Sequence, residues 1–122
     1  MANALCFKAG MYMTGRGYMR NVGKAQELYK EAADKGHPES QYRFAMIIID
    51  EVNENTPEHT RMENYKIALR YLKDSANQNH PGAMTQMGIF LEKGVPGDKN
   101  QELISKDLQL AIGLFTNAAN EF

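Results

Sequence analysis

The stretch KAQELYKEAADKGHP, residues 24–38, decides the fold because its pattern returns at a fixed distance along the chain. The second copy is IALRYLKDSANQNHP, residues 67–81, and the third is LAIGLFTNAANEF, residues 110–122. In each copy two small residues stand together, and the pairs are 43 residues apart: Ala32-Ala33, Ser75-Ala76 and Ala118-Ala119. Self-similarity at one period of this length is typical of a protein built from stacked structural repeats.

A second recurring set lies upstream of each copy and marks the helix that opens each unit. Ala4, Ser40 and Ala83 are followed five residues later by Ala9, Ala45 and Gly88. Small residues at both places allow two helices to approach closely. The sequence therefore predicts one domain over 1–122, made of three repeats at about 4–39, 40–82 and 83–122.

Each repeat is predicted to be a helix, a loop and a second helix. The opening helices are expected at 2–14, 40–52 and 82–93, and the closing helices at 23–35, 62–78 and 106–120, because apolar residues recur near a period of 3.6. Thr60 with Glu63 forms a capping-box pattern, and Asn21 and Ser105 are candidate N-caps. Gly36 and Asn79 stand where a left-handed C-terminal cap is expected, each two residues before a proline. The predicted fold class is all-α.

These residues resemble the Sel-one-like repeat, a relative of the tetratricopeptide repeat. The first unit carries most of the family pattern, at Ala4, Ala9, Tyr12, Gly15, Gly17, Asn21, Lys24-Ala25, Tyr29, Ala32-Ala33 and Gly36. Lys8 and Tyr18 depart from the residues usual in the family, and the second unit lacks both loop glycines. The resemblance implies a right-handed α/α solenoid of three stacked helical hairpins, about six helices in all.

Charge and cysteine content exclude several classes of function. Fourteen basic against fifteen acidic residues give a net charge of −1, which lacks the basic excess expected of a nucleic-acid binder. The single cysteine, Cys6, excludes an internal disulfide framework and predicts an intracellular protein, in the first place cytoplasmic, with an organellar location left open. No apolar stretch reaches the roughly 20 residues that span a bilayer, so no transmembrane segment is expected.

Candidate catalytic and metal-binding residues have simpler structural explanations. His37 and His80 stand at equivalent positions and could form a metal-binding or pH-sensitive pair, but His-Pro is also this protein's turn sequence. Cys6 is expected to be a buried, inert thiol. The sequence Gly15-Arg16-Gly17 lacks the remainder of a phosphate-binding fingerprint, and the acidic residues around Asp50 lack the spacing of a calcium loop. We therefore expect no catalytic residue, no metal site and no cofactor.

The resemblance implies that the opening helices line a concave face along which partners lie. The residues expected to point outward there, and to bind a partner, are Leu5, Phe7, Met11, Arg43, Ile47, Met84, Gln86 and Phe90. The alternative is that the apolar members of this set are ordinary core residues. The long polar loops at about 51–61 and 94–105 form a second candidate surface.

The predicted function is a non-enzymatic adaptor or scaffold that binds other proteins on the concave face or at the ends of the solenoid. The alternative is a structural subunit built permanently into a large multiprotein complex. In that case the apolar ends of the solenoid would be buried against neighbouring subunits.

Overall fold

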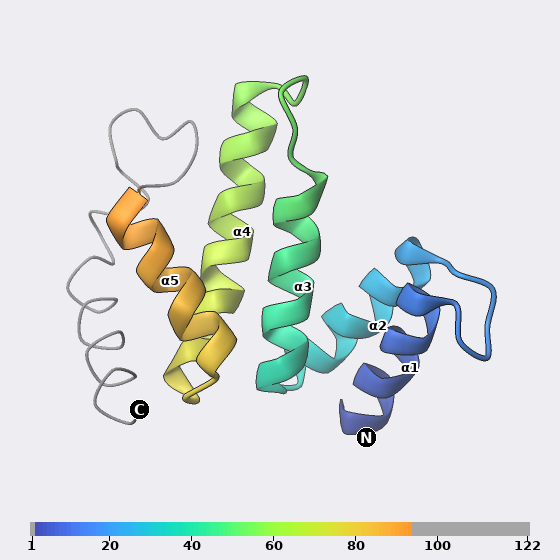
Figure 1. Cartoon of the computed structure of the whole chain (residues 1–122). Coiled ribbons are helices and arrows are strands. Elements are labelled where there is room, and N and C mark those ends of the chain that lie inside the picture. The colour runs from blue at the N-terminus through green and yellow to red at the C-terminus, as the bar shows by residue number, and fades with distance from the viewer. Residues whose placement is uncertain (1, 94–122) are drawn as a thin grey trace.

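Five α-helices follow one another side by side in chain order (Figure 1). The computed structural model describes residues 2–93, and its helices are α1 (Ala2–Thr14), α2 (Val22–Asp34), α3 (Pro38–Glu51), α4 (Glu58–Asn77) and α5 (Pro81–Lys93). The main packing contacts join each helix to the next: α1 with α2, α2 with α3, α3 with α4, and α4 with α5. The all-α, helical-repeat prediction is confirmed.

The helices occupy the positions expected from the repeat. α1 and α2 form the first hairpin, α3 and α4 the second, and α5 opens the third unit. The predicted closing helix at 106–120, its N-cap Ser105 and the loop at 94–105 lie outside the described residues. The exact division into three units stays a prediction.

The helix ends follow from the local sequence. Asn21 caps α2, since its side-chain oxygen accepts a hydrogen bond from the Lys24 amide at 3.0 Å. Gly36 has a φ of +90° and Asn79 a φ of +66°, the left-handed conformation that ends a helix. α3 and α5 then begin at Pro38 and Pro81, where proline needs no amide partner.

The capping box predicted at Thr60 is wrong. α4 begins at Glu58, and the residue at its N-cap position is Pro57, which makes no side-chain capping bond. The fixed φ of proline leads the chain into the helix three residues earlier than the box would require. Thr60 therefore lies inside the first turn of α4 and is exposed.

Small residues fill the places where the helices come closest. Residues of this kind that are fully excluded from solvent occur in all five helices: Ala9, Ala25, Ala32, Ser40, Ala45, Ala68, Ser75, Ala76 and Ala83. Because these side chains add little bulk, neighbouring backbones can approach closely and the larger side chains can interdigitate around them. Of the small residues predicted to allow close approach, Ser40, Ala83, Ala9, Ala45 and Gly88 are buried, whereas Ala4 is exposed near the start of α1, so the prediction is wrong for Ala4.

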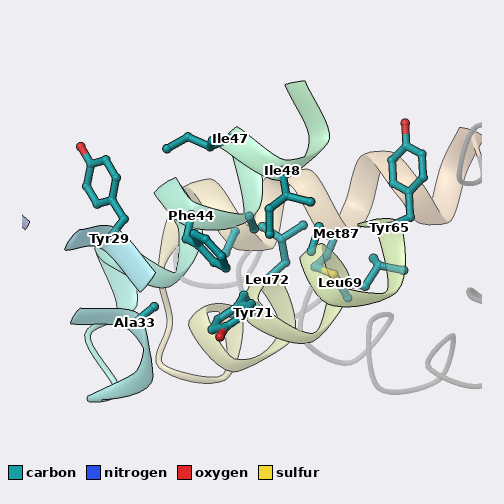
Figure 2. Close-up of a cluster of buried hydrophobic side chains, with 14 of the residues drawn as sticks. Tyr29, Ala33, Phe44, Ile47, Ile48, Tyr65, Leu69, Tyr71, Leu72 and Met87 are labelled. Atoms are coloured by element: carbon teal, nitrogen blue, oxygen red, sulfur yellow. The ribbon is translucent and has the colours of Figure 1, made fainter. Parts of the chain in front are cut away.

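Larger side chains complete the core between α3, α4 and α5 (Figure 2). Phe44 of α3 meets Tyr71 of α4 edge to face, with ring centroids 4.9 Å apart. Tyr65 of α4 meets Phe90 of α5 in the same way at 6.2 Å. Such edge-to-face pairs are a favoured arrangement of aromatic rings and fix the relative position of the helices that carry them.

Polar side chains of α4, and of the residue that follows it, make hydrogen bonds to α2 and α3. The Tyr71 hydroxyl donates a hydrogen bond to Asp34 at 2.6 Å, and the Ser75 hydroxyl donates one to the Pro38 carbonyl at 2.8 Å. The Gln78 amide donates to the Gln41 carbonyl oxygen at 3.0 Å. Each bond spans 37 residues of sequence: the first joins the second hairpin to the first, and the other two join the end of α4 to the start of α3 within the second hairpin.

The bond from Tyr71 to Asp34 should contribute to stability in a pH-dependent way. It is the main reason that the pKa of Asp34 lies below its ordinary value of 3.8, with a further contribution from Lys30 and an opposing one from burial. Because the folded pKa is depressed, this stabilisation is complete above pH 3.8 and is lost as the pH falls through the folded pKa.

We expect Tyr71→Phe to lower the free energy of unfolding by about 1 kcal/mol at neutral pH, because one hydrogen bond to a half-exposed carboxylate is lost. Urea denaturation of both proteins should show this difference shrinking as the pH falls below 3.8 and through the lowered pKa of Asp34. Tyr42→Phe is the matched control, since the Tyr42 ring stacks on His80 but its hydroxyl makes no hydrogen bond among residues 2–93. A pH-independent difference would contradict this account.

Two glycines of the first hairpin should respond in opposite ways to a methyl group. Gly17 lies in the α1–α2 loop with a φ of +78°, and an added Cβ would stand 2.6 Å from Met11 Cε. Gly10 lies within α1, where an added Cβ meets only the Tyr29 hydroxyl at 3.6 Å, an ordinary contact. Gly17→Ala should therefore destabilise the fold by about 1 kcal/mol or more, and Gly10→Ala should stabilise it by about 0.5–1 kcal/mol. Thermal melting of the two variants checks both signs.

Candidate functional site: a groove between α1 and α3

A groove of about 500 Å³ opens between α1 and α3. It is lined by both helices and by one tyrosine from α2: Cys6, Gly10, Met13, Thr14, Tyr29, Glu39, Arg43, Met46, Ile47 and Asp50. Its wall is mainly apolar, with a few groups able to make hydrogen bonds. This combination is typical of a surface that holds a ligand or a segment of another protein.

The spacing of the lining residues explains how two helices form one wall. On α1 the residues are 6, 10, 13 and 14, and on α3 they are 39, 43, 46, 47 and 50. Both series follow the three- and four-residue spacing of one helix face. Gly10 has no side chain to fill the space, and the Tyr29 hydroxyl comes closest to it. The missing side chain at Gly10 therefore helps to keep the groove open.

Charged groups gather at the end of the groove where α3 begins. The Arg43 Nε donates a hydrogen bond to Glu39 Oε1 at 2.7 Å, and the other carboxylate oxygen of Glu39 is hydrogen-bonded to His80 Nε2. Burial acts to raise the pKa of Glu39, but the bonds from His80 and Arg43 outweigh it, so the pKa lies below its ordinary value. The same bond has the opposite effect on its donor, since it raises the pKa of Arg43. Glu39 and Arg43 are therefore both charged and fixed in position at neutral pH.

Tyr29 is the contribution of α2 to the groove. Its side chain is almost fully buried, and burial is the main reason that its pKa lies above the ordinary tyrosine value. At neutral pH it therefore presents a neutral hydroxyl, which can both donate and accept a hydrogen bond.

The residues predicted to bind a partner fall into three groups. Arg43 and Ile47 line the groove. Leu5, Met11 and Gln86 are half-buried, and Phe7 is exposed over 74% of its surface. Met84 and Phe90 are 1% and 5% exposed, so the expectation that they point outward is wrong: both belong to the buried core, where the Tyr65 ring of α4 packs against Phe90. A binding role for any of the eight residues stays a prediction.

The α1 residues that line the groove were not predicted, and two of them, Cys6 and Gly10, lie one position from residues that were. The sequence prediction chose Leu5, Phe7 and Met11, whereas the groove uses Cys6, Gly10 and Met13. A shift of one residue rotates a side chain by about 100° around a helix, which is enough to take it off the groove wall. The apolar residues of α1 do not by themselves indicate which of its sides faces the groove. The glycine at position 10, facing the aromatic position 29 of the partner helix, is the signal that could have found the groove.

The two repeat histidines have a structural role that the sequence did not reveal. His37 Nδ1 accepts a hydrogen bond from the Ser40 amide and so caps α3, and His80 Nδ1 accepts one from the Ala83 amide near the start of α5. Gly82 packs closely on the His80 ring and on the Tyr42 ring stacked against it, because an added Cβ at Gly82 would stand 3.0 Å from each. Among residues 2–93 no three His, Cys, Asp or Glu side chains gather in a way that could hold a metal ion.

The remaining candidates are also placed by the structure. Cys6 is a free thiol that is half-buried in the groove wall, not the fully buried thiol expected from the sequence. Gly15 and Gly17 both have a φ of +78°, the left-handed turn that the repeat requires. In the loop between α3 and α4, the Asn53 amide donates to Thr56 Oγ1 at 3.0 Å. None of the helices among residues 2–93 is long and apolar enough to cross a membrane.

A second groove, of about 660 Å³, lies on α2, α3 and α4 and was not predicted. Phe44, Ile48, Ile67 and Tyr71 supply its apolar lining, and Arg70 stands 5.0 Å from the centre of the Tyr71 ring. The closing helices α2 and α4 thus contribute a further recessed surface, away from the groove between α1 and α3.

Comparison with known proteins agrees with this repeat architecture. The family model described as Sel1 repeat matches residues 2–37, 60–80 and 81–121, which together make up most of the chain. "Chitin synthase regulatory factor 3" of Schizosaccharomyces pombe is 34% identical over 83 residues, which cover 68% of this chain and 8% of that protein. "Chitin synthase regulator SKT5" of Saccharomyces cerevisiae is 28% identical over 106 residues, covering 80% of this chain and 14% of that protein.

The chain thus spans only a small part of the length of the curated relatives that it matches. The three matches fall one in each of the units expected from the 43-residue period, although the second covers only residues 60–80 and leaves out α3, and the described helices form the hairpins that such repeats adopt. The chain belongs to the Sel1 repeat family, within the superfamily of tetratricopeptide-like helical repeats.

Proposed function

We propose that this chain is a non-enzymatic adaptor that binds a segment of a partner protein in the groove between α1 and α3. Proteins with Sel1 repeats mediate protein–protein interactions, which supports the general class. The observation that carries the specific proposal is the groove itself, because its apolar wall is interrupted by the fixed Glu39–Arg43 pair and the neutral Tyr29 hydroxyl. Apolar anchors would enter beside Met46, and backbone or polar groups would bond at Arg43.

The arrangement of charges supports binding rather than catalysis. Glu39 is held by both Arg43 and His80, and Arg43 Nε is occupied by Glu39, so neither side chain is poised to exchange a proton with a substrate. His80 is committed at both ring nitrogens, to the Ala83 amide and to Glu39. Glu39 and His80 are thus engaged in joining α3 to the start of α5.

The relatives support a regulatory role. Both carry names that describe regulators of chitin synthase, and we extend to this chain only the class, a protein that modulates another protein by binding it. Cytoplasmic location forms part of the same proposal, since a chain with one cysteine needs no oxidising compartment to fold. A permanent structural subunit of a large complex is the competing proposal.

Met46→Glu tests the groove directly. Met46 lines the groove and is half-buried, so a carboxylate there should repel an apolar anchor and lower partner recovery by about tenfold. The measurement is affinity purification of the tagged chain from its native cells, with quantitative mass spectrometry of each co-purifying protein.

The matched control is Thr60→Glu, which adds the same charge at an exposed position of α4 that lines neither groove. Proteins lost with Met46→Glu but retained with Thr60→Glu support the proposal, provided that both variants melt like the wild type. Equal recovery with all three chains would contradict it. Stoichiometric recovery of one large complex, together with aggregation of the isolated chain, would instead support the structural subunit.

A further inference from the structure

Charge is segregated along this chain although its total is near zero. Residues 2–26 contain four charged side chains, all basic: Lys8, Arg16, Arg20 and Lys24. The rest of the chain holds the other ten basic residues and all fifteen acidic ones, a net charge of −5. All four cations are exposed, and they lie on α1, on the α1–α2 loop and on the first turn of α2. The first hairpin therefore presents positive charge that the overall composition hides.

These cations are largely free of acidic neighbours. Lys24 lies 3.7 Å from Glu27 in an exposed pair, and Arg20 Nε donates to the Met13 carbonyl. No acidic side chain among residues 2–93 pairs with Lys8, Arg16 or Arg20. Their charge is thus available to an external anion.

The same region carries two of the most exposed apolar side chains of the described structure. Met19 is exposed over 90% of its surface and Phe7 over 74%. The Tyr18 ring stacks on Tyr12 with centroids 4.5 Å apart, and Lys8 Nζ lies 6.0 Å from the Tyr18 ring.

Contacts between the loop and α1 join these residues into one surface. Gly17 lies against the end of Met11, one turn of α1 beyond Phe7. Residues 17 and 18 of the loop therefore pack on α1 against Met11 and near Lys8, and Met19 follows them directly in the chain. We call this surface the α1 patch: Phe7, Lys8, Met11, Tyr18 and Met19.

We propose that the α1 patch is a second docking surface, and that its occupant is an acidic protein segment with interspersed large apolar residues. Carboxylates of the segment would pair with Lys8, Arg16 and Arg20, and its apolar side chains would cover Phe7 and Met19. Opposite charge steers such a segment to the surface, and burial of the exposed Phe and Met side chains holds it there. This surface lies on other residues of α1 than the groove wall, so it goes beyond the function proposed above.

A membrane surface is a poorer fit for the α1 patch. Leu5, Ala9, Tyr12 and Met13 of α1 pack on the core, so α1 cannot turn a full apolar face into a bilayer without leaving its hairpin. Duplex nucleic acid would meet the −5 charge of the remaining chain over a long stretch of phosphates, whereas a short segment meets only the basic surface.

The test is fluorescence anisotropy with the full chain and a synthetic peptide in which Asp and Glu alternate with Leu and Phe. Its control is the same peptide with Asn and Gln in place of the acids. The acidic peptide should bind, the neutral one should bind at least about tenfold more weakly, and a rise in salt from about 50 to 500 mM should weaken the acidic peptide most.

Two double variants divide the contributions. Lys8→Glu with Arg16→Glu should lower affinity at least about tenfold and abolish the salt dependence, and Phe7→Ser with Met19→Ser should lower affinity but leave the salt dependence. The control is Lys35→Glu with Lys66→Glu, an equal charge change at exposed positions elsewhere, which should bind within about twofold of wild type.

Several outcomes would overturn the α1 patch. Equal weakening by the control variant would make the binding non-specific. Tighter binding of phosphatidylserine vesicles or duplex DNA than of the peptide would assign another occupant, and light scattering that shows self-association through Phe7 and Met19 would assign a second copy of the chain. If Met46→Glu abolishes binding of the peptide and the α1 variants do not, the peptide binds in the groove. That result would overturn the α1 patch and agree with the proposed function.

Discussion

Close approach of neighbouring helices is the constraint on which the rest of this structure depends. It is possible only because small residues recur at the crossing points, where Ala25 and Ala68, 43 residues apart, are both fully excluded from solvent. Larger residues at these points would separate the backbones and open the core that Phe44, Tyr71 and Leu72 fill. On α1, Ala9 is also fully excluded from solvent. Gly10 beside it has no side chain, which leaves room for the groove between α1 and α3.

A second layer of interactions fixes how one hairpin sits on the next. The hydrogen bond from Tyr71 to Asp34 joins the second hairpin to the first, and those from Ser75 and Gln78 join the end of α4 to the start of α3. His80 adds a further link, because one ring nitrogen bonds the Ala83 amide of α5 while the other contacts Glu39 of α3. Hydrogen bonds are directional, whereas contacts between alanine side chains are not. The alanine contacts therefore allow the helices to pack closely, and the hydrogen bonds fix the angle between them.

Most of the fold could be predicted from the sequence because its signals are local and repeated. The positions of α1, α2, α3 and α5 follow from paired small residues, helix periodicity and the turn residues Gly36 and Asn79. The start of α4 could not be predicted in the same way, since Pro57 and the Thr60 pattern compete and only the packed chain decides between them. The groove depended on helix rotation, which apolar spacing defines poorly on a helix as apolar as α1. Burial of Phe90 depends on its contact with Tyr65 of α4, which no local signal encodes.

The groove and the α1 patch place two different chemistries on one helix. Cys6, Gly10 and Met13 face a recess with a fixed ion pair, whereas Phe7, Lys8 and Met11 belong to an exposed, basic surface. On this account, two segments of a partner bound at once, one in the groove between α1 and α3 and one on the α1 patch, would raise the effective affinity without a larger single interface. This arrangement suits an adaptor, because each contact can remain weak while their combination is selective.

The most direct test of this account is site-specific photo-cross-linking in native cells, with a photoreactive amino acid at position 46 in one chain and at position 60 in another. The account predicts that defined partner proteins cross-link from position 46, in the groove wall, and not from position 60, on the exposed surface of α4. The same partners captured from both positions, or from position 60 alone, would contradict the claim that the recess between α1 and α3 is where this protein binds.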